Sequence, residues 1–232
     1  MEHVAALSEL QELLKPLEVV VWGEAAMASL GVPVVPHNIM LVPSEQDYAA
    51  VLDRVEREGF RNTPWSYGSL DPADIEAHPE SKRLRQIHAT ADQHYMILNI
   101  HSTRYKFPSG RFPSLQLLFL RPDYVDLGPP LPSTPDGPSS CQDGSIAFTR
   151  QGIFLYPDVS TLLKSFIRTG LKDEDGKTWK TILYVWITSY ICVYLPVRPD
   201  SLDGCKDESV KELFSQLIQS DFVTRWDRSR NS

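Results

Sequence analysis

Hydrophobic residues in the first quarter of the chain switch between helical and strand spacing. Apolar side chains recur every three or four positions over residues 4–14, which predicts an amphipathic helix. Continuous apolar runs at 18–22 and 38–42 predict two buried strands, and the Ala-rich stretch after Gly23 predicts a short helix between them. The pattern over residues 48–58 predicts a second amphipathic helix.

The next stretch favours strands over helices. Residues 61–80 contain three prolines among many polar side chains, which is typical of an exposed loop. Short segments of alternating or apolar character at 84–90, 95–103 and 115–120 predict three strands, with a loop over residues 104–113 between the last two.

A proline-rich segment separates two halves of different character. Residues 126–145 hold five prolines and three glycines in twenty positions, which indicates a loop or linker. After it, a short strand pair around 146–156 is followed by three helical patterns, at 158–169, 178–195 and 208–222. The expected organisation is an α/β domain over 1–125, a linker over 126–145 and a mainly helical C-terminal portion over 146–232.

The segment from Val19 to Phe60 resembles the core of the nucleotidyltransferase superfamily, in particular its small minimal and antitoxin-like branches. Those proteins have a strand, a Gly-Gly or Gly-Ser turn that opens a short helix, an Asp-x-Asp strand, and an amphipathic helix ending in Gly-Phe. Here Gly23 matches the turn glycine, and Glu24 follows it. The resemblance implies an α/β (α+β) fold with a nucleotidyltransferase-like mixed sheet flanked by helices.

The metal-binding carboxylates of that family are missing. By the resemblance, two of them would fall at Asn38 and Met40, and the third at Asn99 or His101. A thioether is a soft ligand that magnesium does not favour, and an Asn side chain offers one neutral oxygen. We therefore expect no metal, no cofactor and no metal-dependent nucleotidyl transfer.

Charge is distributed unevenly along the chain. The whole chain carries a net charge of −7, yet the segment 82–121 contains seven basic residues against Asp92 alone. These are Lys82, Arg83, Arg85, Arg104, Lys106, Arg111 and Arg121. A basic segment with aromatic residues among its cations is typical of a surface that binds a nucleotide or RNA, tRNA included. The alternative is that these cations pair with the acidic remainder of the chain.

The resemblance also defines a candidate site. If it holds, His37, Asn38, Asn99 and His101 would converge near the former metal cleft. His37 and His101 would then be candidate catalytic acids or bases, because histidine titrates near neutral pH. Gly23 and Glu24 would lie at a helix start whose N–H groups can bind phosphate. The alternatives are structural histidines and a plain tight turn.

Cysteine usage and the longest apolar run bear on location. Cys141, Cys192 and Cys205 are scattered, without a Cys-x-x-Cys pair, which favours a reducing compartment over a disulfide framework. The N-terminus carries acidic residues, unlike a secretory signal. The apolar run at 181–195 is too short to span a bilayer and predicts a buried helix. We expect a cytoplasmic protein without membrane contact.

Three functional hypotheses follow. The first is a nucleotidyltransferase-fold pseudoenzyme that binds a phosphate-bearing ligand, nucleotide or RNA, through Lys82, Arg83, Arg85, Arg104, Lys106 and Arg111. The second is a metal-free small-molecule transferase or cyclase, such as one that forms cyclic dipeptides from aminoacyl-tRNA. The third is an interaction protein that uses its acidic surface and aromatic C-terminal helices.

Overall fold

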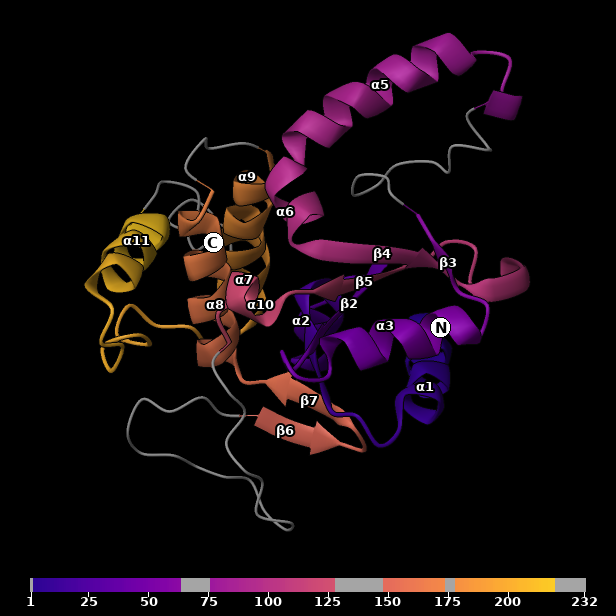
Figure 1. The fold of residues 1–232 in the computed structure, drawn as a ribbon. Coiled ribbons are helices and arrows are strands. Elements are labelled where there is room, and N and C mark those ends of the chain that lie inside the picture. Colours follow the sequence, from indigo (N-terminus) through magenta and orange to yellow (C-terminus); the bar gives the residue numbers. More distant parts are fainter. Residues whose placement is uncertain (1, 64–75, 128–147, 174–177, 220–232) are drawn as a thin grey trace.

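The computed structural model describes residues 2–63, 76–127, 148–173 and 178–219. Within them, the fold is built on a seven-stranded mixed sheet of order β3-β4-β5-β2-β1-β7-β6 (Figure 1). The strands are β1 (Val19–Trp22), β2 (Asn38–Pro43), β3 (Arg61–Asn62), β4 (Ser102–Lys106), β5 (Gln116–Leu120), β6 (Phe148–Gln151) and β7 (Phe154–Pro157). The mixed α/β class expected from the sequence is confirmed.

Helices cover the sheet and extend beyond it. They are α1 (Glu2–Leu14), α2 (Gly23–Ser29), α3 (Tyr48–Arg57), α5 (Ser81–His94), α6 (Met96–Ile100), α7 (Pro122–Val125), α8 (Val159–Leu171), α9 (Thr178–Val185), α10 (Cys192–Tyr194) and α11 (Glu208–Gln219). A π-helical turn, Trp186–Ile191, joins α9 to α10. In Figure 1, α8, α9 and α11 gather on one side of the molecule, and α5 extends away from the body.

Strand directions decide which loops meet at each edge of the sheet. β1 is antiparallel to β2 and parallel to β7, whereas β2 is parallel to β5. The carboxyl ends of β2 and β5 therefore lie at the same edge as the amino ends of β1 and β7. The sheet also contains strands from both sides of the proline-rich segment, because β7 pairs with β1.

An aromatic cluster joins the sheet to the C-terminal helices. Trp22 of β1 lies edge-on to Phe166 of α8, with ring centroids 4.9 Å apart, and packs near Trp179 and Trp186. Its indole N–H donates to Ser165 Oγ at 2.8 Å. All four rings are buried, so the C-terminal aromatic residues form core as well as surface.

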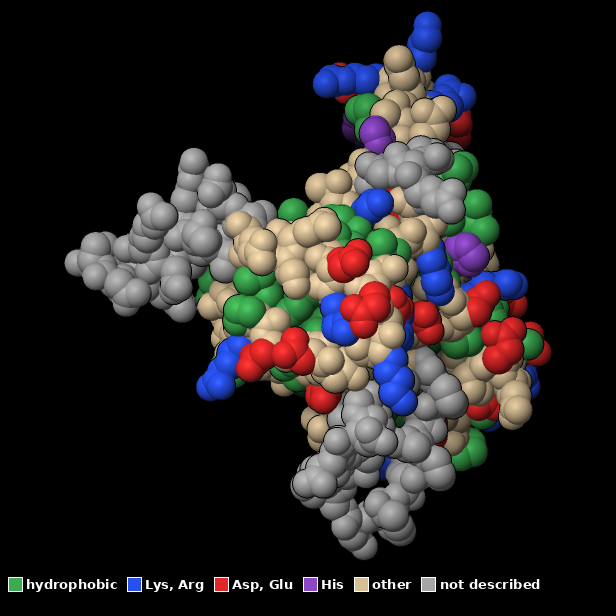
Figure 2. Space-filling model, turned by 90° about the vertical axis from the view of Figure 1, so that its left-hand side faces the viewer, with side chains coloured by type: hydrophobic (Ala, Val, Ile, Leu, Met, Phe, Trp, Pro, Cys, Tyr) green, Lys and Arg blue, Asp and Glu red, His purple; other side chains and the backbone are tan. Residues whose placement is uncertain are grey.

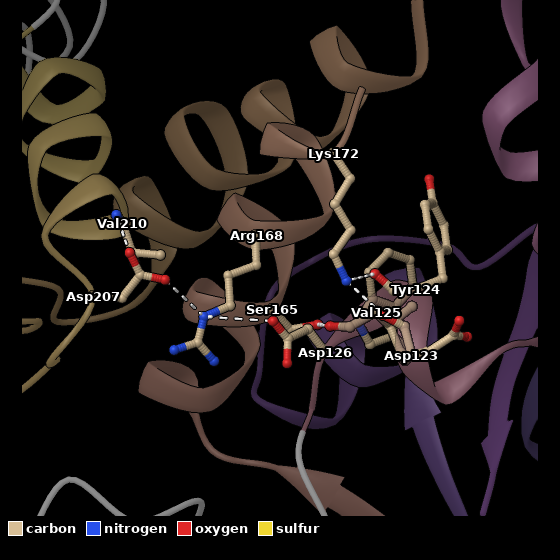
Figure 3. A network of polar contacts seen from close by, with 10 residues as sticks. Asp123, Tyr124, Val125, Asp126, Ser165, Arg168, Lys172, Asp207 and Val210 are labelled. Carbon is tan, nitrogen blue, oxygen red and sulfur yellow. Dashed lines mark hydrogen bonds and ion pairs between the residues drawn. The ribbon is translucent and has the colours of Figure 1, made fainter. Parts of the chain in front are cut away.

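Polar side chains of α8 and of Lys172, which directly follows it, hold the short helix α7 in place (Figure 3). Ser165 Oγ donates to the carbonyl of Val125 at 2.5 Å, and Lys172 Nζ donates to the carbonyls of Asp123 and Tyr124 at 2.5 and 3.0 Å. These carbonyls have no partner within α7 itself, because a helix leaves its last carbonyls unpaired. The fold thus fixes the segment that follows β5.

Two of the three strands expected between residues 84 and 120 are wrong. Residues 84–90 lie within helix α5, and residues 95–103 contain helix α6, with strand pairing only from Ser102 onward. β4 then continues into the segment expected as a loop over 104–113, and β3 lies in the loop expected over 61–80. Alternation over a short segment fits either structure, and α5 has no neighbouring strand with which to pair.

Other expectations lie partly outside the described residues. These include most of the 126–145 segment, Cys141 and residues 220–222 of the last helix. Cys192 and Cys205 are free thiols. None of the helices in the described ranges is long and apolar enough to cross a membrane.

Candidate functional site

The turn after β1 is filled by a neighbouring side chain. Gly23 has a φ of +63°, and a Cβ added to it would lie 2.6 Å from Met40 Sδ. Met40 is fully buried on the adjacent strand. Where the resemblance places a metal-binding carboxylate, the thioether therefore packs against the turn.

Glu24 has its own structural partners. Its Oε2 accepts the backbone N–H groups of His37, at 2.8 Å, and of Asn38, at 3.2 Å. Glu24 and Asn38 are both buried. The carboxylate thus fixes the chain where it enters β2.

The two candidate catalytic histidines lie at opposite ends of β5. The carbonyl of His37 accepts the N–H of Gln116 at 3.2 Å, whereas the carbonyl of His101 accepts the N–H of Arg121 at 2.9 Å. Gln116 begins β5 and Arg121 follows its last residue. Gln116 and Arg121 are five residues apart, which in a strand is about 17 Å, so the structure does not bring His37 and His101 together.

His101 is held against an aromatic ring. Its imidazole stacks on Tyr124, with centroids 4.5 Å apart and planes 4° from parallel. Burial lowers the pKa of His101, Arg121 and Lys172 lower it further, and Asp123 opposes them. The neutral form is therefore favoured, as expected for a packed structural histidine.

The basic residues expected to form one surface are separated. Lys82, Arg83 and Arg85 are exposed on α5, whereas Arg104 is only 4% exposed on β4. Arg104 Nη2 donates to Asn99 Oδ1 at 3.3 Å. These two residues, each predicted to contact a ligand, therefore contact each other. The expectation that Arg104 is exposed is wrong, because β4 continues to Lys106 and places Arg104 inside the sheet, opposite Leu118 of β5, rather than in the loop expected over 104–113.

Several of these cations have acidic partners. Arg83 pairs with Glu80 at 3.4 Å, Arg85 with Glu76 at 3.3 Å, and Arg111 with Glu9 of α1 at 2.6 Å. Lys106 lies on β4 opposite Arg61 of β3. The three ion pairs of Arg83, Arg85 and Arg111 favour the alternative that the basic segment pairs with acidic parts of the chain.

A cavity of about 830 Å³ lies at the sheet edge where β2 and β5 end and β1 begins. Its apolar part includes the buried side chains of Val20, Val42, Pro43, Leu127 and Leu155. Five acidic residues also line it, namely Glu18, Glu45, Asp47, Asp123 and Asp126. No lysine, arginine or histidine is among the described residues that line this cavity.

The acidic residues come from three segments that the sheet brings together. Glu18 directly precedes β1, Glu45 and Asp47 follow β2, and Asp123 and Asp126 follow the end of β5. Sequence reasoning missed this site. Its only signal was acidic residues beside predicted strands, and that signal has meaning only once the strand order is known.

Three of the five carboxylates have partners in the protein. Glu18 pairs with Arg150, Asp47 accepts from Ser44 Oγ at 2.8 Å, and Asp126 lies 3.8 Å from Arg168 Nε (Figure 3). Asp126 also has a left-handed backbone, with a φ of +49°. Non-glycine residues in that region are strained, and such residues concentrate at functional sites.

The acidic residues of the cavity do not form a metal cluster. Within the part of the chain that the structure describes, no group of three or more His, Cys, Asp or Glu side chains could hold a metal ion. The carboxylates are spread around an apolar centre instead. Comparison of the chain with known protein families, curated proteins and solved structures finds no match, so the site is interpreted from its own geometry.

Proposed function

We propose that this chain is a binding protein whose ligand is an organic cation with an apolar body, held in the cavity beside β1, β2 and β5. The observation that carries the proposal is the pairing of an apolar interior with five acidic residues and no basic one among the described lining. A volume of about 830 Å³ is within the range of small-molecule sites.

Each part of the cavity favours one part of such a ligand. Burial of apolar ligand surface against Val42 and Leu155 contributes about 25 cal/mol per Å² removed from water. The carboxylates attract an ammonium or guanidinium group and repel an anion. Because Glu45 and Asp123 are exposed, their attraction is weakened by salt.

Three ligands that share one aromatic ring test the proposal. Benzylammonium, benzyl alcohol and benzoate carry charges of about +1, 0 and −1 at neutral pH. Calorimetric titration should give affinity in that order, with benzylammonium binding weakened by salt. Equal affinity for the three, or no binding of benzylammonium, would overturn the proposal.

Matched variants locate the binding site. Glu45→Gln/Asp123→Asn removes two exposed cavity charges and should weaken benzylammonium binding severalfold while leaving benzyl alcohol binding unchanged. Glu212→Gln removes an exposed charge on α11, away from the cavity lining, and should change neither. If Glu212→Gln weakens binding as much as the cavity variant does, net charge rather than the cavity attracts the ligand.

A phosphate-bearing ligand is a second candidate, supported by the position of α5. This helix extends from the body, and Arg83 and Arg85 have side chains 73% and 56% exposed (Figure 1). Their ion pairs with Glu80 and Glu76 are surface pairs, each worth less than about 1 kcal/mol, so phosphate can replace them. Binding of tRNA at low salt that is lost in Arg83→Ala/Arg85→Ala would support this candidate, and no binding would contradict it.

A metal-free transferase has less support. That hypothesis needs an acid and a base in one cleft, and His37 and His101 lie at opposite ends of β5. A product mass found in cells that express the chain, and lost in His101→Ala, would revive it.

A further inference from the structure

Helix α5 combines cations with the exposed aliphatic side chain of Ile87. Lys82, Arg83 and Arg85 are exposed, and Ile87 is 51% exposed. In a helix, residues four apart lie on the same side, so Arg83 and Ile87 form one surface.

The surface of α5 has the same chemistry as the ligand proposed for the cavity. A guanidinium group lies one turn from an aliphatic side chain on α5, and the cavity presents carboxylates around an apolar centre. On the face drawn in Figure 2, acidic side chains gather across the middle of the body, with basic ones among them, while Lys and Arg side chains lie at the end of α5 with acidic ones beside them. The two surfaces are complementary in charge and in apolar character.

The α5 of the same chain is held away from the cavity. Its last residue, His94, contacts Thr178 at the start of α9 through a side-chain hydrogen bond of 2.9 Å. From there, α5 extends outward, away from the segments that line the cavity (Figure 1). A second copy of the chain can supply the helix that the first copy cannot.

We infer that two copies of this chain associate by placing the Arg83 and Ile87 surface of α5 from one copy at the acidic cavity of the other. This inference rests on the proposed function, since it requires that the cavity selects a cation beside an apolar group. The contact either closes reciprocally into a dimer or repeats from copy to copy as a chain. In both arrangements the association weakens with salt, because its charges are exposed.

Charge reversal on each side tests the contact. Sedimentation velocity over a concentration and salt series should show that the wild-type chain self-associates at low salt. Arg83→Glu/Arg85→Glu and Glu45→Arg/Asp123→Arg should each remain monomeric. An equimolar mixture of the two variants should associate again, because the carboxylates introduced on one α5 then face the guanidinium groups introduced at positions 45 and 123 of the other variant, while the unchanged α5 faces the unchanged cavity.

Controls separate the contact from general effects of charge. Arg198→Glu and Glu212→Arg reverse exposed charges outside both surfaces and should associate like the wild-type chain. Circular dichroism melts check that each variant is folded. Where a reversal unfolds the chain, Arg83→Ala/Arg85→Ala and Glu45→Gln/Asp123→Asn should still weaken association severalfold.

Two results would overturn the inference. One is a wild-type chain that stays monomeric at low salt and high concentration, and the other is a variant mixture that does not associate. Arg83→Glu/Arg85→Glu leaves the cavity intact, so benzylammonium binding by this variant tests the proposed function separately. If it binds benzylammonium while the wild-type chain stays monomeric, the proposed function stands and the inference falls. If the mixture associates but benzylammonium neither binds nor disrupts the complex, the contact stands and the small-molecule function falls.

Discussion

Met40 Sδ occupies the space into which a side chain at Gly23 would project, because a Cβ at Gly23 would lie 2.6 Å from it. Gly23 begins α2 directly after β1, and Met40 lies on β2, where it pairs with Trp22, the last residue of β1. This contact joins the turn glycine to the residue that replaces a metal-binding carboxylate in the resemblance. The close approach of Met40 accounts for a glycine at this turn, and no bound ligand is needed to explain it.

Gly23→Ala should destabilise the fold more than Gly31→Ala. Both glycines have positive φ values, +63° and +93°, so alanine adds backbone strain of about 1–2 kcal/mol at either position. Only Gly23 also has a close neighbour, since nothing lies within 4 Å of a Cβ at Gly31. We expect urea denaturation to show a further loss of about 1–3 kcal/mol for Gly23→Ala. Equal losses would mean that Met40 moves aside freely.

Arg104→Ala should lower the free energy of unfolding by about 2–4 kcal/mol, because it removes a buried charged donor and the packing of its stem. Lys106→Ala, two residues along the same strand and partly exposed, should cost less than about 1 kcal/mol. Thermal melts of the two single variants compare them directly. Equal losses of melting temperature in the two variants would mean that the effect comes from any substitution in β4 rather than from the burial of Arg104.

Stability should decrease as the pH falls below about 7, in part through His101. Its pKa is lowered in the folded chain from the ordinary value of 6.5, so the unfolded chain takes up the proton first. The contribution of His101 to the free energy of unfolding is therefore complete above about pH 6.5. It decreases as the pH falls toward the lowered pKa that His101 has in the folded chain. His101→Phe keeps a ring on Tyr124 without the titration, so its stability between pH 5 and 7 should vary less than that of the wild-type chain. An identical pH dependence in the two proteins would assign the effect to other groups.

Magnesium or manganese at millimolar concentration should not raise the melting temperature. A metal stabilises a fold only if it binds the folded chain preferentially, and Asn38 and Met40 are buried side chains that offer no anionic oxygen. Differential scanning fluorimetry with and without EDTA measures the effect. An increase of several degrees would mean that another set of residues supplies the ligands.

The buried strands and the long helices could be predicted from the sequence because each carries a sustained pattern. β1 and β2 are continuous apolar runs, and α8 repeats its apolar residues at helical spacing over three turns. Helix α5 could not be separated from a strand, since Leu84 and Ile87 are spaced as on a helix, whereas Ile87 and Ala89 alternate with polar residues as on a strand. Whether this segment forms a helix or a strand depends on its tertiary surroundings, which a local pattern does not contain.

The candidate site depends on relations that no local pattern carries. Glu18, Glu45 and Asp123 are far apart in sequence and meet because β2 lies between β1 and β5. Strand direction separates His37 from His101, which the resemblance had placed together, because β2 is parallel to β5 and β4 is antiparallel to it. The charge pattern of residues 82–121 also did not predict the ion pairs, because Arg83 and Arg85 pair with Glu80 and Glu76, which lie just before that segment.

The parallel pairing of β1 with β7 has a consequence for synthesis of the chain. Val19 pairs with Phe154, so one edge of β1 stays open on the ribosome until residue 154 has been made. During that time four consecutive residues that are buried in the finished fold, Val19–Trp22, form an exposed apolar strand edge. A shortened product ending near residue 127 would keep that edge permanently, and we expect it to be recovered in inclusion bodies rather than in the soluble fraction.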